Sequence, residues 1–188
     1  MTNARNKSLA TSLHGTIHRP IVLVGLMGCG KSSVGKVIAP LLDLEFFDSD
    51  AEIEDAAGMS IAEIFENYGE AEFRSLERRI FERLLDGQPK VIAAGGGAFV
   101  QDDTRTVIQE GSVSIWLQAK LGVLVARTQK RGNRPILAGK DHRVVLRELM
   151  ERRRPAYEQA ALRVFSGPES VDKTVLAALE ALNRYFRS

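Results

Sequence analysis

Residues 25 to 32 read Gly25-Leu-Met-Gly28-Cys-Gly30-Lys31-Ser32, which matches every position of the phosphate-binding loop pattern G-x-x-x-x-G-K-[ST]. The apolar run Ile21-Val-Leu-Val24 comes directly before it, and a helical pattern follows. A buried strand that turns through glycines into a helix aims backbone N–H groups at one point, where a polyphosphate can bind. Lys31 is then expected to reach the β and γ phosphates, and the Ser32 hydroxyl to hold Mg²⁺. The alternative is a glycine-rich turn with a solvated lysine.

The composition indicates one globular domain. The 188 residues are 44% hydrophobic and 27% charged, which suits a domain with a sizeable core. A net charge of +2 argues against strong nonspecific binding to nucleic acid. The charge is uneven, because residues 43–86 hold fourteen Asp and Glu against four Arg, whereas residues 120–154 hold eleven Lys and Arg against three acids. The second region is therefore expected to hold an anionic ligand.

The cysteine count and the first residues bear on the compartment. Cys29 is the single cysteine, so the chain has no intrachain disulfide, which fits a reducing cytoplasm. We interpret Cys29 as a small filler of the loop. Residues 1–19 are polar and lack the apolar segment of a signal peptide, and no later run is long enough to span a bilayer. We predict a soluble cytoplasmic protein without a membrane partner, with a flexible tail over 1–19 and one domain over 20–188.

Strand and helix patterns alternate along the chain. Short apolar runs predict strands over 21–25, 44–47, 91–94, 112–117 and 162–165, and helical patterns cover 31–42, 50–57, 60–68, 70–85, 121–129, 142–152 and 171–186. This alternation predicts an α/β fold with a parallel sheet that is covered on both faces. Pro40 is expected to kink or end the first of these helices, and Pro155 to end the one that begins at 142.

Two acids stand at the end of the second predicted strand, in Phe47-Asp48-Ser49-Asp50. Ligands of open α/β sheets bind beyond the carboxyl ends of the strands, so both acids should lie near the γ phosphate. Asp48 could then steady Mg²⁺, and Asp50 could accept a proton or hydrogen bond from an attacking hydroxyl. The alternative is that Ser49 or Asp50 caps the next helix, because Ser49-x-x-Glu52 has the spacing of a capping box.

Later stretches add cations and glycines. Gly95-Gly96-Gly97 follows a buried strand and either lets a ligand approach the backbone or forms a loose turn. Residues 127–140 are polar and cationic and predict a mobile flap over phosphates, with a solvated loop or a nucleic-acid patch as alternatives. The lack of aromatics there argues against nucleic acid. One of the arginines at 152–154 is expected to turn inward toward an anion, whereas Arg74 alone indicates a solvated or salt-bridged residue.

Together these stretches resemble the shikimate kinases, a branch of the nucleoside monophosphate kinase-like P-loop proteins. The resemblance covers nearly everything from Ile21 to the last helix. It implies a three-layer P-loop kinase fold with five parallel strands in the order 2-3-1-4-5, a substrate-binding segment over about 48–80 and a lid over about 130–141. It rests on Gly25-Leu-Met-Gly-Cys-Gly-Lys-Ser32, Phe47-Asp48-Ser-Asp50, Glu72-Phe73-Arg74, Gly95-Gly96-Gly97, Arg134-Pro135-Ile-Leu137, and Arg153 with Pro155-x-Tyr157.

The resemblance also implies an activity, which is Mg²⁺-dependent transfer of the γ-phosphoryl group of ATP to the 3-hydroxyl of shikimate, giving shikimate 3-phosphate and ADP for aromatic amino acid biosynthesis. A monomer with a small-molecule substrate and no nucleic-acid partner is expected. Catalysis would use Asp50, Lys31 and Arg134, with Asp50 as a base or an orienting group. Shikimate would be bound by Asp50, Arg74, Gly95, Gly96, Gly97 and Arg153; ATP by Gly28, Cys29, Gly30, Lys31, Ser32, Ser33, Arg127 and Arg134; and the metal by Ser32 and Asp48.

Three rival functions stay open from the residues. A kinase for another small metabolite, such as gluconate, shares the loop and the fold but should lack the combined set of Asp50, Arg74, the three glycines and Arg153. A nucleoside monophosphate kinase is a weaker alternative. The third rival is a nucleotide-dependent binding module whose basic flap docks on nucleic acid or protein. Such a module has no need of an acid pair aimed at a hydroxyl substrate.

Overall fold

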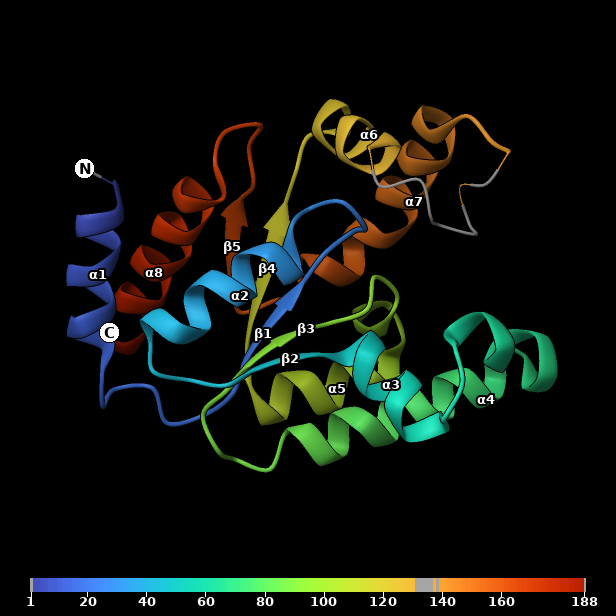
Figure 1. Ribbon diagram of the computed structural model, residues 1–188, viewed down its shortest axis with the longest axis horizontal. Coiled ribbons are helices and arrows are strands. Elements are labelled where there is room, and N and C mark those ends of the chain that lie inside the picture. The colour runs from blue at the N-terminus through green and yellow to red at the C-terminus, as the bar shows by residue number, and fades with distance from the viewer. Residues whose placement is uncertain (1, 131–136, 138, 188) are drawn as a thin grey trace.

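The chain folds into a five-stranded parallel sheet between two layers of helices (Figure 1). A computed structural model describes residues 2–130, 137 and 139–187, with side chains from residue 4 onward. The strands pair in the order β2-β3-β1-β4-β5, which confirms the α/β class and the strand order that the resemblance implied. They are β1 (Ile21–Val24), β2 (Phe46–Asp48), β3 (Val91–Ala93), β4 (Val113–Gln118) and β5 (Leu162–Phe165).

The helices cover both faces of this sheet. Two of them, α2 and α8, pack together on one face with α1 against them, whereas α4 and α5 pack together on the other (Figure 1). The α-helices are α1 (Thr2–Leu13), α2 (Lys31–Leu41), α3 (Ser49–Ala57), α4 (Ile61–Leu84), α5 (Asp102–Gly111), α6 (Leu121–Gln129), α7 (His142–Tyr157) and α8 (Val171–Arg187), and a short 3-10 turn, η1, spans Ala98–Val100. Of the helices in the described part of the chain, none has both the length and the apolar composition needed to cross a membrane.

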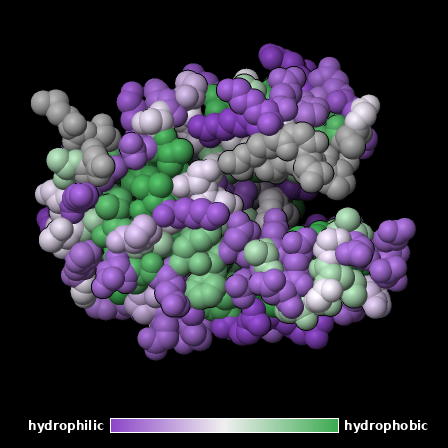
Figure 2. Space-filling model, viewed as in Figure 1, coloured by the Kyte–Doolittle hydropathy of each residue, from purple (hydrophilic) through white to green (hydrophobic). Residues whose placement is uncertain are grey.

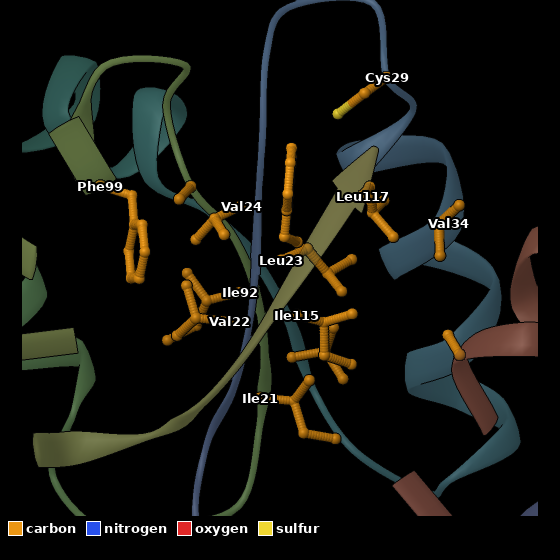
Figure 3. Close-up of a cluster of buried hydrophobic side chains, with 14 of the residues drawn as sticks. Ile21, Val22, Leu23, Val24, Cys29, Val34, Ile92, Phe99, Ile115 and Leu117 are labelled. Atoms are coloured by element: carbon orange, nitrogen blue, oxygen red, sulfur yellow. The ribbon is translucent and has the colours of Figure 1, made fainter. Parts of the chain in front are cut away.

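The core is built on the central strand β1. Its four residues are apolar and fully buried, because helices pack on both faces of a parallel sheet. Alternate side chains of the strand therefore enter different halves of the core (Figure 3). Val22 lies with Ile92 and Phe99 on one side, while Leu23 lies with Leu117 on the side of α2 (Figure 3). The carboxyl end of β1 is held rigidly by this packing at the point where the phosphate-binding loop begins.

The N-terminal residues differ from the sequence-based expectation of a flexible tail. Residues Thr2–Leu13 form α1, whose Ala10 and Leu13 are buried against α8. An ion pair joins Arg5 to Glu180 at 2.7 Å, and the Asn6 amide donates to the carbonyl of Asp172 at 3.3 Å. This helix was not predictable from its own sequence, because the residues of α8 that it contacts lie more than 160 residues further along the chain.

The helices agree with the predictions in part. The two helices predicted over 60–68 and 70–85 are both present and together make up α4, whose helical backbone is interrupted at Gly69. The helix that was expected to end before Pro155 continues to Tyr157, so α7 contains that proline in its last turn. The helix α5 was not predicted at all. By contrast, α2 ends at Leu41, directly after Pro40, as predicted.

Candidate active site

A cleft of about 540 Å³ lies at the carboxyl edge of the sheet, where the sequence predicted the ligand site. It brings together the loop after β1, the end of β2, the loop after β3, α6 and the first turns of α8. Figure 2 shows the surface hollowed between the end of the molecule with α6 and α7 and the end with α3 and α4. Nine of the predicted site residues line this cleft: Gly28, Gly30, Lys31, Ser32, Ser33, Asp48, Asp50, Gly96 and Arg127.

The phosphate-binding loop has the form that its pattern predicted. Gly30 stands directly before α2 with a φ of 103°, a conformation that favours glycine. Because Gly30 has no side chain to cap the helix, the first N–H groups of α2 are left to a ligand in the cleft. The Lys31 ammonium donates to the carbonyl of Gly25 at 2.8 Å. Cys29 is 1% exposed and does not line the cleft, which agrees with its interpretation as a filler.

Asp48 connects the loop to the acid pair. One of its carboxylate oxygens accepts from the Ser32 hydroxyl at 2.7 Å, and the other accepts from the backbone N–H of Asp50 at 3.2 Å. Asp48 is therefore the cap of α3, which corrects the alternative that Ser49 or Asp50 caps it. The Ser49 hydroxyl instead accepts from the N–H of Gly95 at 2.8 Å.

The pair of Ser32 and Asp48 suits Mg²⁺. Both supply hard oxygen atoms, and their 2.7 Å separation is near the roughly 3.0 Å between neighbouring ligands in an octahedron with Mg–O distances of about 2.1 Å. Within the described residues there is no group of three or more His, Cys, Asp or Glu side chains that could hold a metal alone. A site of this kind fits an ion that shares its coordination between one carboxylate, nucleotide phosphates and water.

The three glycines after β3 form the other wall of the site. A methyl group on Gly95 would overlap the Asp50 carboxylate, and one on Gly97 would lie 2.9 Å from the Arg74 guanidinium. Arg153 donates to the carbonyl of Gly96 at 2.7 Å. A carboxylate and two guanidinium groups thus meet at this loop, although they come from α3, α4 and α7. Gly95 and Gly97 therefore allow side chains of the protein to approach the backbone closely, whereas a Cβ at Gly96 would meet only ordinary contacts.

Glu77 completes this cluster and was missed by the sequence analysis. It is 1% exposed, and it accepts from Arg74 at 2.9 Å. Burial raises the pKa of the Glu77 carboxyl, the nearby Arg74 charge offsets part of the rise, and the Asp50 carboxylate adds to it. The sequence does contain a sign of its role. Glu77 falls on the apolar stripe of α4 between Phe73 and Ile80, and a charged residue at such a buried position needs a partner.

Arg127 joins the phosphate-binding loop to the segment before α8. It donates to the carbonyls of Gly28 and Cys29 at 3.3 Å each, to the Ser166 hydroxyl at 3.0 Å and to the carbonyl of Gly167 at 2.6 Å. The sequence predicted Arg127 but not the segment around it, which lines the cleft through Ser166, Pro168, Glu169, Ser170, Val171 and Thr174.

The remaining predicted arginines differ in their placement. Of the three at 152–154, Arg153 turns inward as expected, while Arg152 is exposed and Arg154 pairs with Glu158 at 2.7 Å. Arg134 lies outside the described residues, as does most of the predicted lid.

The comparisons with known proteins identify the family of the chain. A family model described as shikimate kinase matches residues 27–183, most of the chain. The chain belongs to the shikimate kinase family. A shikimate kinase of Paramagnetospirillum magneticum is 49% identical over 177 residues, which cover 94% of this chain and 91% of that protein.

Solved structures of the shikimate kinase family are also similar. The shikimate kinase from Acinetobacter baumannii in complex with shikimate has a TM-score of 0.82 and 31% identity, and the match covers 94% of this chain and 97% of that one. A gluconokinase from Sinorhizobium meliloti has a TM-score of 0.58 at 22% identity, with coverage of 92% and 98%. The likeness to the gluconokinase is one of fold alone.

Proposed function

We propose that this chain is a shikimate kinase that transfers the γ-phosphoryl group of ATP to the 3-hydroxyl of shikimate, for the biosynthesis of aromatic amino acids. The observation that carries the proposal is the meeting of Asp50, Arg74 and Arg153 at the three glycines, beside the cleft that the phosphate-binding loop lines. Shikimate has one carboxylate and three hydroxyls, so it needs cations at one end and an acceptor at the other. A nucleotide-dependent switch gives no account of this set of charges. Gluconate also carries a carboxylate and hydroxyls, so the family match supports shikimate over gluconate as the acceptor.

On the acceptor side, Arg74 and Arg153 bind the carboxylate of shikimate, since guanidinium groups match a carboxylate in two-point geometry. Gly95, Gly96 and Gly97 let the ring approach the backbone. Asp50 orients the reacting hydroxyl and accepts its hydrogen bond as the new bond to phosphorus forms. Phosphoryl transfer depends mainly on positioning and on charge stabilisation, so orientation by Asp50 contributes more than early removal of the proton.

On the donor side, the N–H groups of residues 28–33 and the Lys31 ammonium hold the phosphates of ATP. Ser32 and Asp48 would hold Mg²⁺, which neutralises phosphate charge when it is bound. Arg127, fixed by four acceptors at the mouth of the cleft, packs on the adenine. We assign Arg134 to the lid over about 130–141 as the cation that meets the phosphates, by the resemblance alone.

We further propose that the enzyme works as a monomer in the cytoplasm. Of the groups assigned to ATP and to shikimate, those that the structure describes meet within one copy of the chain, so the site needs no residue from a second copy. Light scattering on the purified protein, with and without ATP, tests the oligomeric state. We also propose that residues 20–188 form one kinase domain, with a substrate-binding segment over about 48–80, and that α1 belongs to the same folded unit through its packing against α8.

A coupled assay of ADP release tests the activity. Shikimate, gluconate and nucleoside monophosphates are offered in turn with ATP and Mg²⁺, and we expect turnover with shikimate alone. Turnover with gluconate or with a nucleoside monophosphate, but not with shikimate, would overturn the proposal. ATP hydrolysis that ignores shikimate and responds to nucleic acid would favour the binding module instead.

A further inference from the structure

Tyr157 belongs to the motif Pro155-x-Tyr157, to which the proposed function gives no role. It is the last residue of α7 and is 3% exposed. Its ring stacks on Trp116, with the ring centres 6.0 Å apart and an angle of 23° between the planes. Burial raises the pKa of the Tyr157 hydroxyl, so the group stays protonated and acts as a hydrogen-bond donor.

The hydroxyl of Tyr157 shares its acceptor with Arg153. Tyr157 donates to the carbonyl of Gly96 at 2.6 Å, and Arg153 donates to the same oxygen at 2.7 Å. The two residues are four apart on α7, so both project from one face of that helix. A carbonyl oxygen has two lone pairs, and here both are used.

The orientation of the Gly96 carbonyl depends on these two hydrogen bonds, because the backbone around it is flexible. The peptide between Gly96 and Gly97 can rotate with little steric resistance, since neither residue has a Cβ. In a trans peptide the N–H points opposite to the carbonyl. The donors on α7 therefore also fix the N–H of Gly97, which points away from α7.

The two donors are not equivalent once the acceptor substrate binds. Arg153 is one of the guanidinium groups that we assign to the carboxylate of shikimate, so its donors are drawn toward that group. Within the described part of the chain, the Tyr157 hydroxyl donates to the Gly96 carbonyl alone. When Arg153 turns to the carboxylate, Tyr157 is the group that keeps a partner for the Gly96 carbonyl and the shape of the glycine loop.

We propose that Tyr157 is a positioning residue of the acceptor site, which holds the Gly96 carbonyl so that Arg153 can bind the substrate's carboxylate. This inference rests on the proposed function. It assigns to Tyr157 an effect on the binding of shikimate and not on the binding of ATP.

The test is Tyr157→Phe, which keeps the ring and its stacking on Trp116 and removes only the hydroxyl. We expect the KM for shikimate to rise about tenfold, while the KM for ATP and kcat change by less than about twofold. Tyr185→Phe, on α8, is the matched control and should leave all three constants unchanged. Steady-state kinetics with each substrate varied in turn give these values.

Two further variants separate positioning from a general loss of stability. In an Arg153→Lys background, adding Tyr157→Phe should raise the KM for shikimate by much less than tenfold, because Tyr157 acts on the substrate through Arg153. Leu13→Ala, in the distant helix α1, should lower the melting temperature without changing either KM. An unchanged KM for shikimate in Tyr157→Phe, equal rises in both KM values, or a full tenfold rise in the Arg153→Lys background would each overturn the inference. A wild-type enzyme that does not phosphorylate shikimate would instead overturn the proposed function.

Discussion

At the scale of single residues, the acceptor side of the site depends on charges that are partly or wholly removed from water. Glu77 is a buried carboxylate, and its partner Arg74 is also in contact with the glycine loop. A buried carboxylate without a partner is strongly destabilising, so the pair fixes the direction of the Arg74 guanidinium. Asp50 lies against Gly95 in the same cluster.

Replacing Asp50 by Asn tests the role of its charge. Asn has nearly the same shape and fits against Gly95, so the fold should be kept. We expect turnover to fall about a hundredfold or more, because the amide is a poor acceptor for the hydroxyl, while the affinity for ATP measured by calorimetry stays within about twofold. Asp55→Asn, on the exposed side of the same helix, is the control. Near-normal turnover of Asp50→Asn would contradict a role of the Asp50 charge in the reaction and leave it only a structural role in the first turn of α3.

Glu77 gives a prediction about pH and stability. Its pKa is raised above the ordinary value of 4.5 mainly by burial, so the folded protein holds this proton more tightly than the unfolded chain does. The contribution of Glu77 to the free energy of unfolding is then present at low pH and decreases as the pH rises from 4.5 through the raised pKa.

Urea denaturation at a series of pH values checks this sign. The free energy of unfolding of the wild type, minus that of Glu77→Gln, should decrease as the pH rises above 4.5 and then become constant. Glu82→Gln, half exposed on the same helix, serves as the control with a smaller charge effect. A difference that increases with pH over this range would contradict the assignment of burial as the dominant cause.

Some of the site was predictable from single residues and some was not. Lys31, Ser32 and the acid pair were predictable because each stands next to the strand that positions it. Arg74 was ambiguous, because nothing near it in the sequence indicates that Gly97 lies against its guanidinium. Tyr157 lies in a motif of the family, but its role was not predictable, because its acceptor, the Gly96 carbonyl, is 61 residues away in the sequence.

At the scale of elements, α4 is divided by its kink. Gly69 has a φ of 80° and a ψ of 178°, which is a region of backbone conformation that is nearly exclusive to glycine. Arg74 and Glu77 lie on the part of α4 that follows the kink. The kink sets this part at an angle to the part before it, which a regular helix could not do.

Replacing Gly69 by Ala should therefore be costly. No atom lies within 4 Å of the added methyl group, so the cost comes from the backbone alone, and we expect a loss of roughly 1–3 kcal/mol in the free energy of unfolding. Gly122→Ala is a matched control, because Gly122 is also uncrowded but lies in the regular helix α6. It should be neutral or stabilising by up to about 1 kcal/mol. Equal effects of the two changes, in urea denaturation, would contradict the strain at Gly69.

The helix α1 gives a prediction that separates a packed element from a tail. Leu13 is 1% exposed against α8, so Leu13→Ala should lower the free energy of unfolding by about 2–5 kcal/mol while kcat and both KM values stay unchanged. Ser8→Ala, on the exposed side of α1, should change stability by less than about 0.5 kcal/mol. A loss that small for Leu13→Ala, measured by calorimetry, would restore the view of these residues as a loose tail.

Elements were predictable where the pattern that makes them is local. The strand at 162–165 and the helix at 121–129 were predicted with their observed bounds, because apolar periodicity and turn residues mark both ends. The helix α1 was missed because its short apolar face has meaning only against α8. Pro155 was interpreted as a stop, but a proline in the last turn removes only one hydrogen bond, so α7 continues past it.

At the scale of the whole molecule, the sheet edge collects groups that the chain supplies at widely separated points. The donor side comes from residues after β1 and before α8, and the acceptor side from α3, α4, α7 and the loop after β3. Asp48 touches both sides, with one oxygen on Ser32 and the other on the N–H of Asp50. Local patterns did not determine the strand order that creates this meeting point, and the family resemblance supplied it.

The reactivity of the buried Cys29 thiol can be used to measure opening of the phosphate-binding loop. Its sulfur lies among the core side chains beneath the phosphate-binding loop, and it is the sole thiol in 188 residues (Figure 3). A disulfide reagent such as dithionitrobenzoate should thus label the folded enzyme only when the loop lifts from the core, and ATP at about 100 times its Kd should slow the release of the chromophore about a hundredfold. Labelling of native enzyme as fast as that of urea-unfolded chain would contradict this. This labelling experiment can therefore be done on the wild-type protein, because no other cysteine has to be replaced first.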